Sequence, residues 1–224
     1  ILLIIITAST LVFFQHHQKQ TLISQKTEQA KNLLLVAESV RQNMIKKWDD
    51  GVFTTQQLKE FQQINNTSER ISNILSTVPV ATSWEIVQAK AQEGHFSFKA
   101  PNINARNPKN EAVGREIDVL SFFQNNPQEK DYSYIDETDN TLHYFRSVRL
   151  SSQCEICHGN PQTSEAIWDN QQGVDVLGYK MEGKHAGDLH GAFEIITPLS
   201  NAYAQIHESM LISIAIAIAT LTLL

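Results

Sequence analysis

The stretch DYSYIDETDNTLHYFRSVRLSSQCEICHG, residues 131–159, joins a predicted β-hairpin to both cysteines of the chain. Two runs of alternating apolar and polar residues lie on either side of the turn sequence DETDN. Such alternation is typical of paired strands, although this turn is longer than the two-residue ideal. The cysteine motif follows the second run directly, so we expect a chemical site next to a small sheet.

Helices are predicted before the hairpin. Apolar residues recur at i, i+3 and i+4 over residues 30–48, which predicts a long amphipathic helix that stops at residues 49–51. A threonine at 54 or 55 is expected to cap a second helix. Thr82 and Glu85 have the spacing of a capping box and predict the start of a further short helix.

Two more strands are expected, HFSFKAP (residues 95–101) and GAFEIITPL (residues 191–199), with a helix capped by Asn110 between the first strand and the hairpin. The order is a helical lead-in, then strand, helix, hairpin, motif and strand. This order predicts an α+β fold with an antiparallel sheet, of the kind that PAS-like sensor domains use.

Both ends of the sequence are apolar and uncharged, over residues 1–14 and 209–224. Each run is shorter than the ~20 residues that span a bilayer, but each reaches a chain end. A signal-peptide core and a buried core helix are the alternatives. We interpret the runs as two truncated transmembrane helices on either side of an extracytoplasmic domain of residues 15–208.

The composition is globular, with 42% hydrophobic and 19% charged residues and a net charge of −6 among 224 residues. Without basic runs, nucleic acid is not an expected partner. The sequence also shows no nucleophile–base pair and no phosphate-cradling loop. We therefore do not expect an enzyme within this chain.

CEICHG contains the only two cysteines, Cys154 and Cys157, with His158 directly after them. A disulfide here would close a tiny loop and remove little entropy from the unfolded chain. A thioredoxin-like dithiol needs a βαβ setting, which the upstream hairpin does not supply. A zinc site needs four ligands; His185 and His190 are the nearest further pair, and they keep zinc as a minor alternative.

Attachment of a c-type haem accounts for every position of the motif. Thioether bonds to two porphyrin vinyl groups would use Cys154 and Cys157, and His158 would coordinate the iron as the proximal ligand. Gly159 leaves space where the backbone passes close to the ring. The motif therefore predicts one covalent haem c. Because such haems are attached outside the cytoplasm, it also places the domain in the periplasm of a bacterial inner membrane.

At this point the chain resembles a known family, the c-type-haem, PAS-like extracytoplasmic sensor domains. These lie between two transmembrane helices in bacterial chemotaxis transducers, sensor kinases and cyclic-dinucleotide enzymes, and one cyanobacterial relative stands alone. The similar stretches run in order through nearly the whole loop: VRQNMIKKWDDGVFT, PVATSW, NARNPKNEA, HYFRSVRLSSQCEICHGNP and VLGYKMEGKHAGDLHGAFEIITPL.

The resemblance implies one covalent haem per domain, a signal from a diatomic gas or a redox partner at the iron, and a homodimer. We therefore expect a membrane-anchored haem c sensory input domain that signals across the membrane to a cytoplasmic output module. A membrane-bound monohaem cytochrome c that carries electrons is the alternative.

The distal iron position has several candidate ligands. Met44 lies on the apolar stripe of the first helix, and relatives with a methionine ligand take it from that region. Met181 and His95 are the alternatives, and water or an empty position also fits. A distal cysteine, as in one relative, is excluded because both cysteines belong to the motif.

Arg106, Arg146 and Arg149 are candidate partners of the two haem propionates, because a guanidinium can bind a carboxylate through two hydrogen bonds. Each is equally well explained as a solvated arginine of a strand or loop. Loss of a propionate partner should lower the midpoint potential of the haem, which distinguishes the two interpretations.

Overall fold

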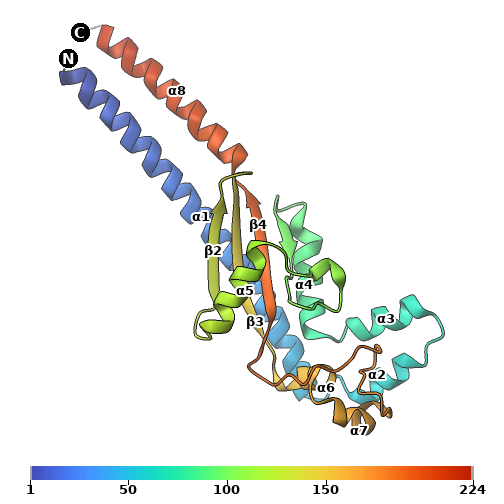
Figure 1. Cartoon of the computed structure of the whole chain (residues 1–224). Coiled ribbons are helices and arrows are strands. Elements are labelled where there is room, and N and C mark those ends of the chain that lie inside the picture. The colour runs from blue at the N-terminus through green and yellow to red at the C-terminus, as the bar shows by residue number, and fades with distance from the viewer. Residues whose placement is uncertain (1, 223–224) are drawn as a thin grey trace.

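A four-stranded antiparallel sheet with the order β1-β4-β3-β2 lies at the centre of the computed structural model, which describes residues 2–222 (Figure 1). Its strands are β1 (Ser97–Lys99), β2 (Asp131–Asp136), β3 (Thr141–Arg149) and β4 (Leu189–Pro198). The helices are α1 (Leu2–Asp49), α2 (Thr55–Gln62), α3 (Thr67–Leu75), α4 (Pro79–Ala91), α5 (Arg115–Asn125), α6 (Glu155–His158), α7 (Ser164–Trp168) and α8 (Ser200–Thr222). Short 3₁₀ turns η1 (Pro108–Asn110), η2 (Ser152–Cys154) and η3 (Pro161–Thr163) complete the chain. The predicted α+β class, the antiparallel sheet and the long N-terminal helix are confirmed.

The predicted hairpin is formed by β2 and β3, with Tyr132 opposite Phe145. Its longer turn is stabilised locally, because the side chain of Asp136 accepts a hydrogen bond from the backbone N–H of Thr138 at 2.9 Å. Asn140 has a φ of 55°, a left-handed conformation that asparagine tolerates better than most residues. The turn residues therefore explain how a four-residue connection still joins two registered strands.

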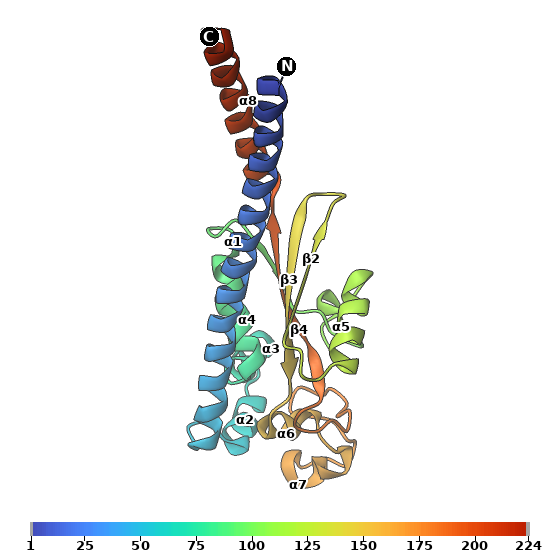
Figure 2. The same cartoon turned by 90° about the vertical axis from the view of Figure 1, so that its left-hand side faces the viewer.

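One face of the sheet packs against α1 and α4 (Figure 2). Ala30, Leu34 and Ala37 of α1 are at most 1% exposed and meet Phe193 and Ile195 of β4. Two alanines on this stripe allow the helix backbone to approach the strand closely. Burial of each large apolar side chain contributes about 1.5–3 kcal/mol, so this layer fixes α1 on the sheet.

The opposite face of the sheet is covered by α5 (Figure 2). Val119, Leu120 and Phe123 of this helix pack against Phe145 of β3 and Ala192 of β4. Successive side chains of β3 and β4 point to opposite faces of the sheet and therefore pack into two separate cores.

Helix starts follow local chemistry, with two differences from the prediction. Asn110 does not cap a helix, because it ends η1 and α5 begins only at Arg115, after Gly114. The Thr54 side chain caps α2 by accepting a hydrogen bond from the N–H of Gln57 at 3.2 Å, as expected. The predicted capping box at Thr82 is wrong, because α4 already begins at Pro79. Proline favours the first helical turn because it lacks an N–H and its φ is already helical. Thr82 instead donates its hydroxyl to the Ser76 carbonyl.

The two chain ends lie at the end of the molecule opposite α6 and α7, where α1 and α8 project side by side (Figures 1 and 2). Among the described residues, one helical segment, Ser200–Thr220, is long and apolar enough to cross a membrane. A transmembrane role for the stretch 1–14 is not confirmed. Residue 1 of that expected span and residues 223–224 of the other lie outside the described residues.

Candidate functional site

The cysteine motif forms a single tight turn directly after the sheet. Cys154 ends η2 and Cys157 lies in α6, so the two residues are about one helical turn apart. Neither forms a disulfide within residues 2–222. Gly159 ends the turn, and a Cβ there would lie 2.4 Å from the Glu155 carbonyl oxygen, which only glycine avoids.

A cavity of about 840 Å³ borders the motif and is lined by Cys154, Cys157 and His158 together. Its volume lies within the range of about 300–1,000 Å³ typical of cofactor and ligand sites. Much of the wall is apolar and comes from α3, α4 and β4, for example from Trp84 and Phe193. The motif thus faces a space large enough for a bulky apolar ligand.

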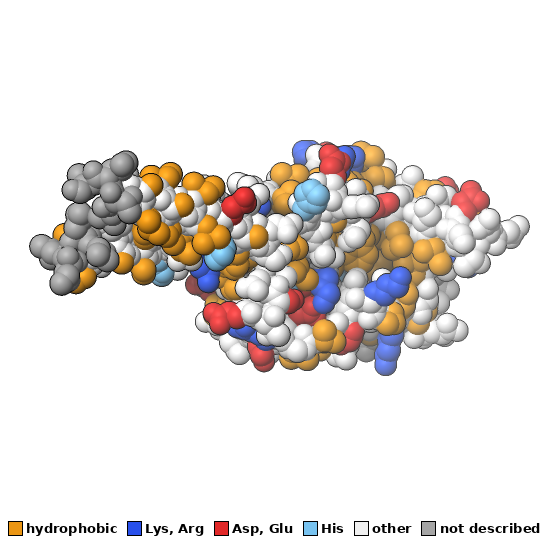
Figure 3. All heavy atoms as spheres, turned by 90° about the horizontal axis from the view of Figure 1, so that it is seen from above, with side chains coloured by type: hydrophobic (Ala, Val, Ile, Leu, Met, Phe, Trp, Pro, Cys, Tyr) orange, Lys and Arg blue, Asp and Glu red, His pale blue; other side chains and the backbone are white. Residues whose placement is uncertain are grey.

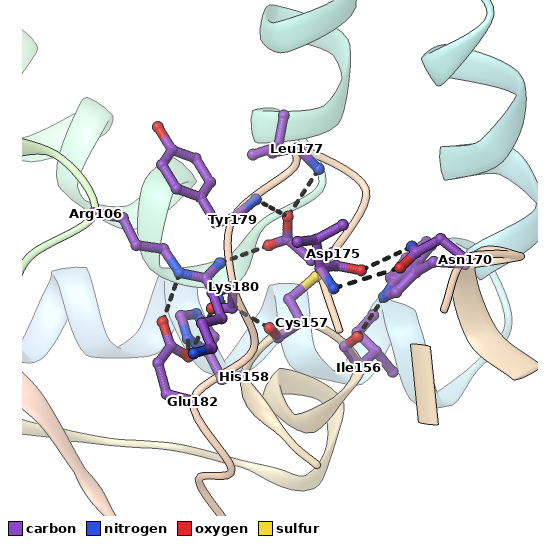
Figure 4. A network of polar contacts seen from close by, with 12 residues as sticks. Arg106, Ile156, Cys157, His158, Asn170, Asp175, Leu177, Tyr179, Lys180 and Glu182 are labelled. Atoms are coloured by element: carbon purple, nitrogen blue, oxygen red, sulfur yellow. Dashed lines mark hydrogen bonds and ion pairs between the residues drawn. The ribbon is translucent and has the colours of Figure 1, made fainter. Parts of the chain in front are cut away.

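His158 is held by a carboxylate from a distant loop (Figure 4). The Oε2 atom of Glu182 lies 2.8 Å from His158 Nδ1. When Nδ1 donates this hydrogen bond, Nε2 carries the lone pair and is the nitrogen available to a metal. This is the arrangement expected of a metal-binding histidine with an oriented ring.

Arg106 grips the same carboxylate and connects it to the motif (Figure 4). Its Nε lies 2.8 Å from Glu182 Oε1, and its Nη2 lies 3.1 Å from Oε2. Nη1 forms an ion pair with Asp175 at 2.6 Å, and Nη2 also donates to the Cys157 carbonyl at 2.9 Å. The guanidinium therefore bridges two carboxylates and the backbone of the motif.

Asp175 is the buried member of this network. Its side chain is 1% exposed. Its Oδ1 atom accepts hydrogen bonds from the N–H groups of Leu177 and Tyr179, at 2.9 and 3.0 Å. A buried carboxylate needs such donors and a counter-charge, and Arg106 supplies the counter-charge.

The ionisation of these groups follows from their contacts. Burial alone would raise the pKa of Glu182, but the hydrogen bonds and charges of His158 and Arg106 lower it to about 2. Burial raises the pKa of the Cys157 thiol well above its usual range, and the Asp175 carboxylate adds to the shift. The site therefore contains an anionic Glu182 and a neutral Cys157 thiol.

His190 lies on the same cavity and was named from the sequence only as a possible zinc ligand. Its ring centroid lies 4.9 Å from that of His158. In the β3–β4 pairing Gly191 faces Val148 and Leu189 faces Arg149, so His190 is the extra residue of a β-bulge. Bulges re-aim side chains, and this one explains how a strand residue reaches the motif.

The environment of His190 is unusual. Its Nδ1 is buried and has no hydrogen-bond partner among the described residues. Burial lowers its pKa to about 3, and the charges of His158, Lys184 and Arg106 act in the same direction. The imidazole is therefore neutral at the wall of the cavity.

The candidate distal ligands lie outside the set of residues that line the cavity. Met44 is buried in α1 at 6% exposure. Met181 is 1% exposed and packs in an apolar cluster with Leu58 and Trp168. His95 is exposed in the turn between α4 and β1. None of these three side chains lines the cavity, although Met181 belongs to the apolar cluster against which Cys157 packs.

The three candidate propionate arginines do not all lie at the cavity. Arg106 and Arg149 line the cavity, whereas Arg146 pairs with Asp131 on the hairpin at 2.6 Å. Arg149 donates to the carbonyls of Phe123 and Gly187. Two further cavity arginines, Arg41 and Arg70, were not predicted.

The sequence around Glu182 and His190 gives only a weak indication that they belong to a site. Both lie in the glycine-containing stretch 178–191, and a polar residue among glycines is a reason to examine a loop. Neither position is close in sequence to the motif. Only the folded chain shows that they meet it.

The chain was compared with known protein families, curated proteins and solved structures. The family model described as Tll0287-like matches residues 18–198. A solved structure, the crystal structure of the cyanobacterial heme-protein Tll0287, is similar with a TM-score of 0.42 and 17% identity, over 68% of this chain and 95% of that chain. No curated protein matches. A similarity this low does not transfer a ligand, so the chemistry of the site is inferred from its own residues.

Proposed function

Since the chain belongs to the Tll0287-like family, we propose that it is a haem-binding sensory input domain with one covalent haem c. The observation that carries this proposal is the cavity at the motif. Cys154, Cys157 and His158 line a single space of about 840 Å³, and His158 is already oriented by Glu182. A haem fits these residues because its attachment points, its iron ligand and its apolar surroundings are all present.

Each motif residue has a separate role. The thiols of Cys154 and Cys157 would each add across a vinyl group, with sulfur bonding one carbon and hydrogen the other, so that no group is released. His158 would donate Nε2 to the iron while Glu182 holds Nδ1. The haem would supply a redox-active iron that can bind a small ligand.

The apolar ends support a membrane anchor for this domain. Large apolar side chains of α1 and α8 are well exposed, for example Phe13 at 71% and Ile216 at 60%. They cover the projecting part of the molecule (Figure 3). Surface of this kind is stable in lipid rather than in water. We infer that these helices hold the domain at a bacterial inner membrane, with the haem end in the periplasm.

The fold offers a short covalent route for a signal. His190 at the start of β4 contacts His158, and β4 ends at Pro198, two residues before α8 begins at Ser200. A gas would give a signal only if it binds more tightly when this strand is in one of two positions. A change of iron oxidation state would do so only if it stabilises one of these positions more than the other. The proposed signal is therefore a shift of β4 and α8 relative to α1.

The full chain, expressed with a c-type haem maturation system and purified in detergent, tests the proposal. We expect haem that stays attached on a denaturing gel, and loss of attachment when Cys154 and Cys157 are both changed to Ser. His158→Ala should alter the visible spectrum. His185→Ala is the matched control, because this side chain is 71% exposed and should leave the spectrum unchanged.

The same preparation separates the sensor from the electron carrier. A reduced spectrum that changes under CO or NO supports a sensor with an accessible iron. A covalent haem whose reduced spectrum is unchanged under both gases would favour an electron carrier. A chain that takes up no haem would refute the proposal.

A further inference from the structure

The hydrogen bond at His158 Nδ1 affects more than the orientation of the ring. Glu182 Oε2 lies 2.8 Å from His158 Nδ1, and the same carboxylate is bound by Arg106 at 2.8 and 3.1 Å. Arg106 in turn pairs with the buried Asp175 at 2.6 Å. Two carboxylates and one guanidinium thus stand behind His158, and together they carry one net negative charge.

We propose that Glu182 is a positioning residue that sets the reduction potential of the iron through His158. The inference rests on the proposed haem function. A carboxylate that accepts the Nδ1 hydrogen bond makes the imidazole a stronger donor through Nε2. A stronger donor and a nearby negative charge both favour the more positive, oxidised iron. Glu182 therefore lowers the potential.

Arg106 acts in the opposite direction. Its positive charge balances one of the two carboxylates, so its removal would leave two net negative charges behind His158. The geometry also shows that Arg106 is engaged by Glu182, Asp175 and the Cys157 carbonyl. In this proposal its effect on the iron passes through this network.

The direction of the two effects provides the test. Glu182→Gln keeps the size of the side chain and removes its charge, and it should shift the ferric-to-ferrous equilibrium by about 10- to 100-fold toward the reduced form, which is about 59 to 118 mV upward. Arg106→Gln should shift the potential downward. Glu165→Gln is the matched control, because Glu165 is exposed in α7 and bonds Gln171 instead.

The measurement is a redox titration of the haem-loaded full chain, followed by its visible spectrum, with a thermal melt of each variant. Opposite shifts for the Glu182 and Arg106 variants, and none for the Glu165 variant, are the expected result. An unchanged potential in a folded, haem-loaded Glu182→Gln protein would overturn the proposal. Potential shifts of the same sign in both variants would also overturn the proposal. A general disturbance of the site, unlike the proposed charges, would shift the potential in the same direction in both.

A conservative variant covers the case in which Glu182→Gln takes up no haem. Glu182→Asp keeps the charge but shortens the reach to His158 Nδ1, so a raised potential supports the role of the hydrogen bond and an unchanged potential contradicts it. If the wild-type chain itself carries no haem, the proposed function fails, and that outcome is seen before any titration begins.

Discussion

Removal of the Arg106 side chain should destabilise the domain through Asp175. Asp175 is 1% exposed and would keep its two backbone donors but lose its counter-charge at 2.6 Å. Glu182 is 35% exposed, so water can replace much of what Arg106 gives it. Almost all of the cost of Arg106→Ala should therefore come from the buried carboxylate.

The magnitude follows from the burial. Breaking a buried ion pair by removing one partner typically costs about 3–5 kcal/mol, because it leaves an uncompensated charge. In a chain of this size each 1 kcal/mol lowers Tm by about 2–4 °C, so we expect a fall of about 6–20 °C. The fall should be measured by circular dichroism on haem-loaded wild type and variant, together with urea unfolding.

A double-mutant cycle identifies the partner responsible. Asp175→Asn keeps an oxygen for the N–H groups of Leu177 and Tyr179 but removes the charge that needs Arg106. The double variant should then lose less stability than the sum of the two single variants, with a coupling of about 1–3 kcal/mol. Additive losses, or a loss below about 1 kcal/mol for Arg106→Ala, would refute this reasoning.

Three further predictions concern the motif, the cavity wall and α1. Gly159→Ala places a Cβ 2.4 Å from the Glu155 carbonyl oxygen, and this overpacking should cost about 1–3 kcal/mol and reduce covalent haem on a denaturing gel; normal attachment would contradict it. His190→Phe removes a buried nitrogen without a partner in the described chain and should stabilise the haem-free protein by about 1 kcal/mol in urea unfolding, whereas a loss would show that the nitrogen is satisfied. Burial alone would raise the pKa of Glu38, but hydrogen bonding and charge from Arg41 lower it overall, so its contribution to the unfolding free energy is present above pH ~4.5 and lost as pH falls through the folded pKa. Glu38→Gln should lack this part of the acid dependence, and an unchanged pH profile would argue against it.

Several elements were predictable because their signals are local. The hairpin of residues 131–150 follows from alternation, and the cap at Thr54 follows from one side chain and one nearby N–H. The strand predicted at 191–199 is β4, which runs from Leu189 to Pro198. The start of α4 was mispredicted because two local signals compete there. Pro79 begins the helix before Thr82 can cap it, and the pattern alone does not rank the two.

The sequence by itself limited the chemistry that the motif can perform. Cys154, Cys157 and His158 are adjacent in the chain, so their spacing already limits what they can bind. The choice of the distal candidates had no such support. Met44 was selected by resemblance to relatives and Met181 as an alternative, and neither side chain lines the cavity.

Only the tertiary structure decided which groups stand behind and beside His158. Glu182 lies 24 positions from His158 and 76 from Arg106, so no periodic pattern connects the three. They meet because Arg106, from one loop, contacts both Asp175 and Glu182 of another. His190 reaches the same cavity because a bulge turns it out of the regular strand. Contacts within a turn or strand depend on neighbours in the chain and can be predicted from them, whereas this network depends on the packing of separate loops around one cavity.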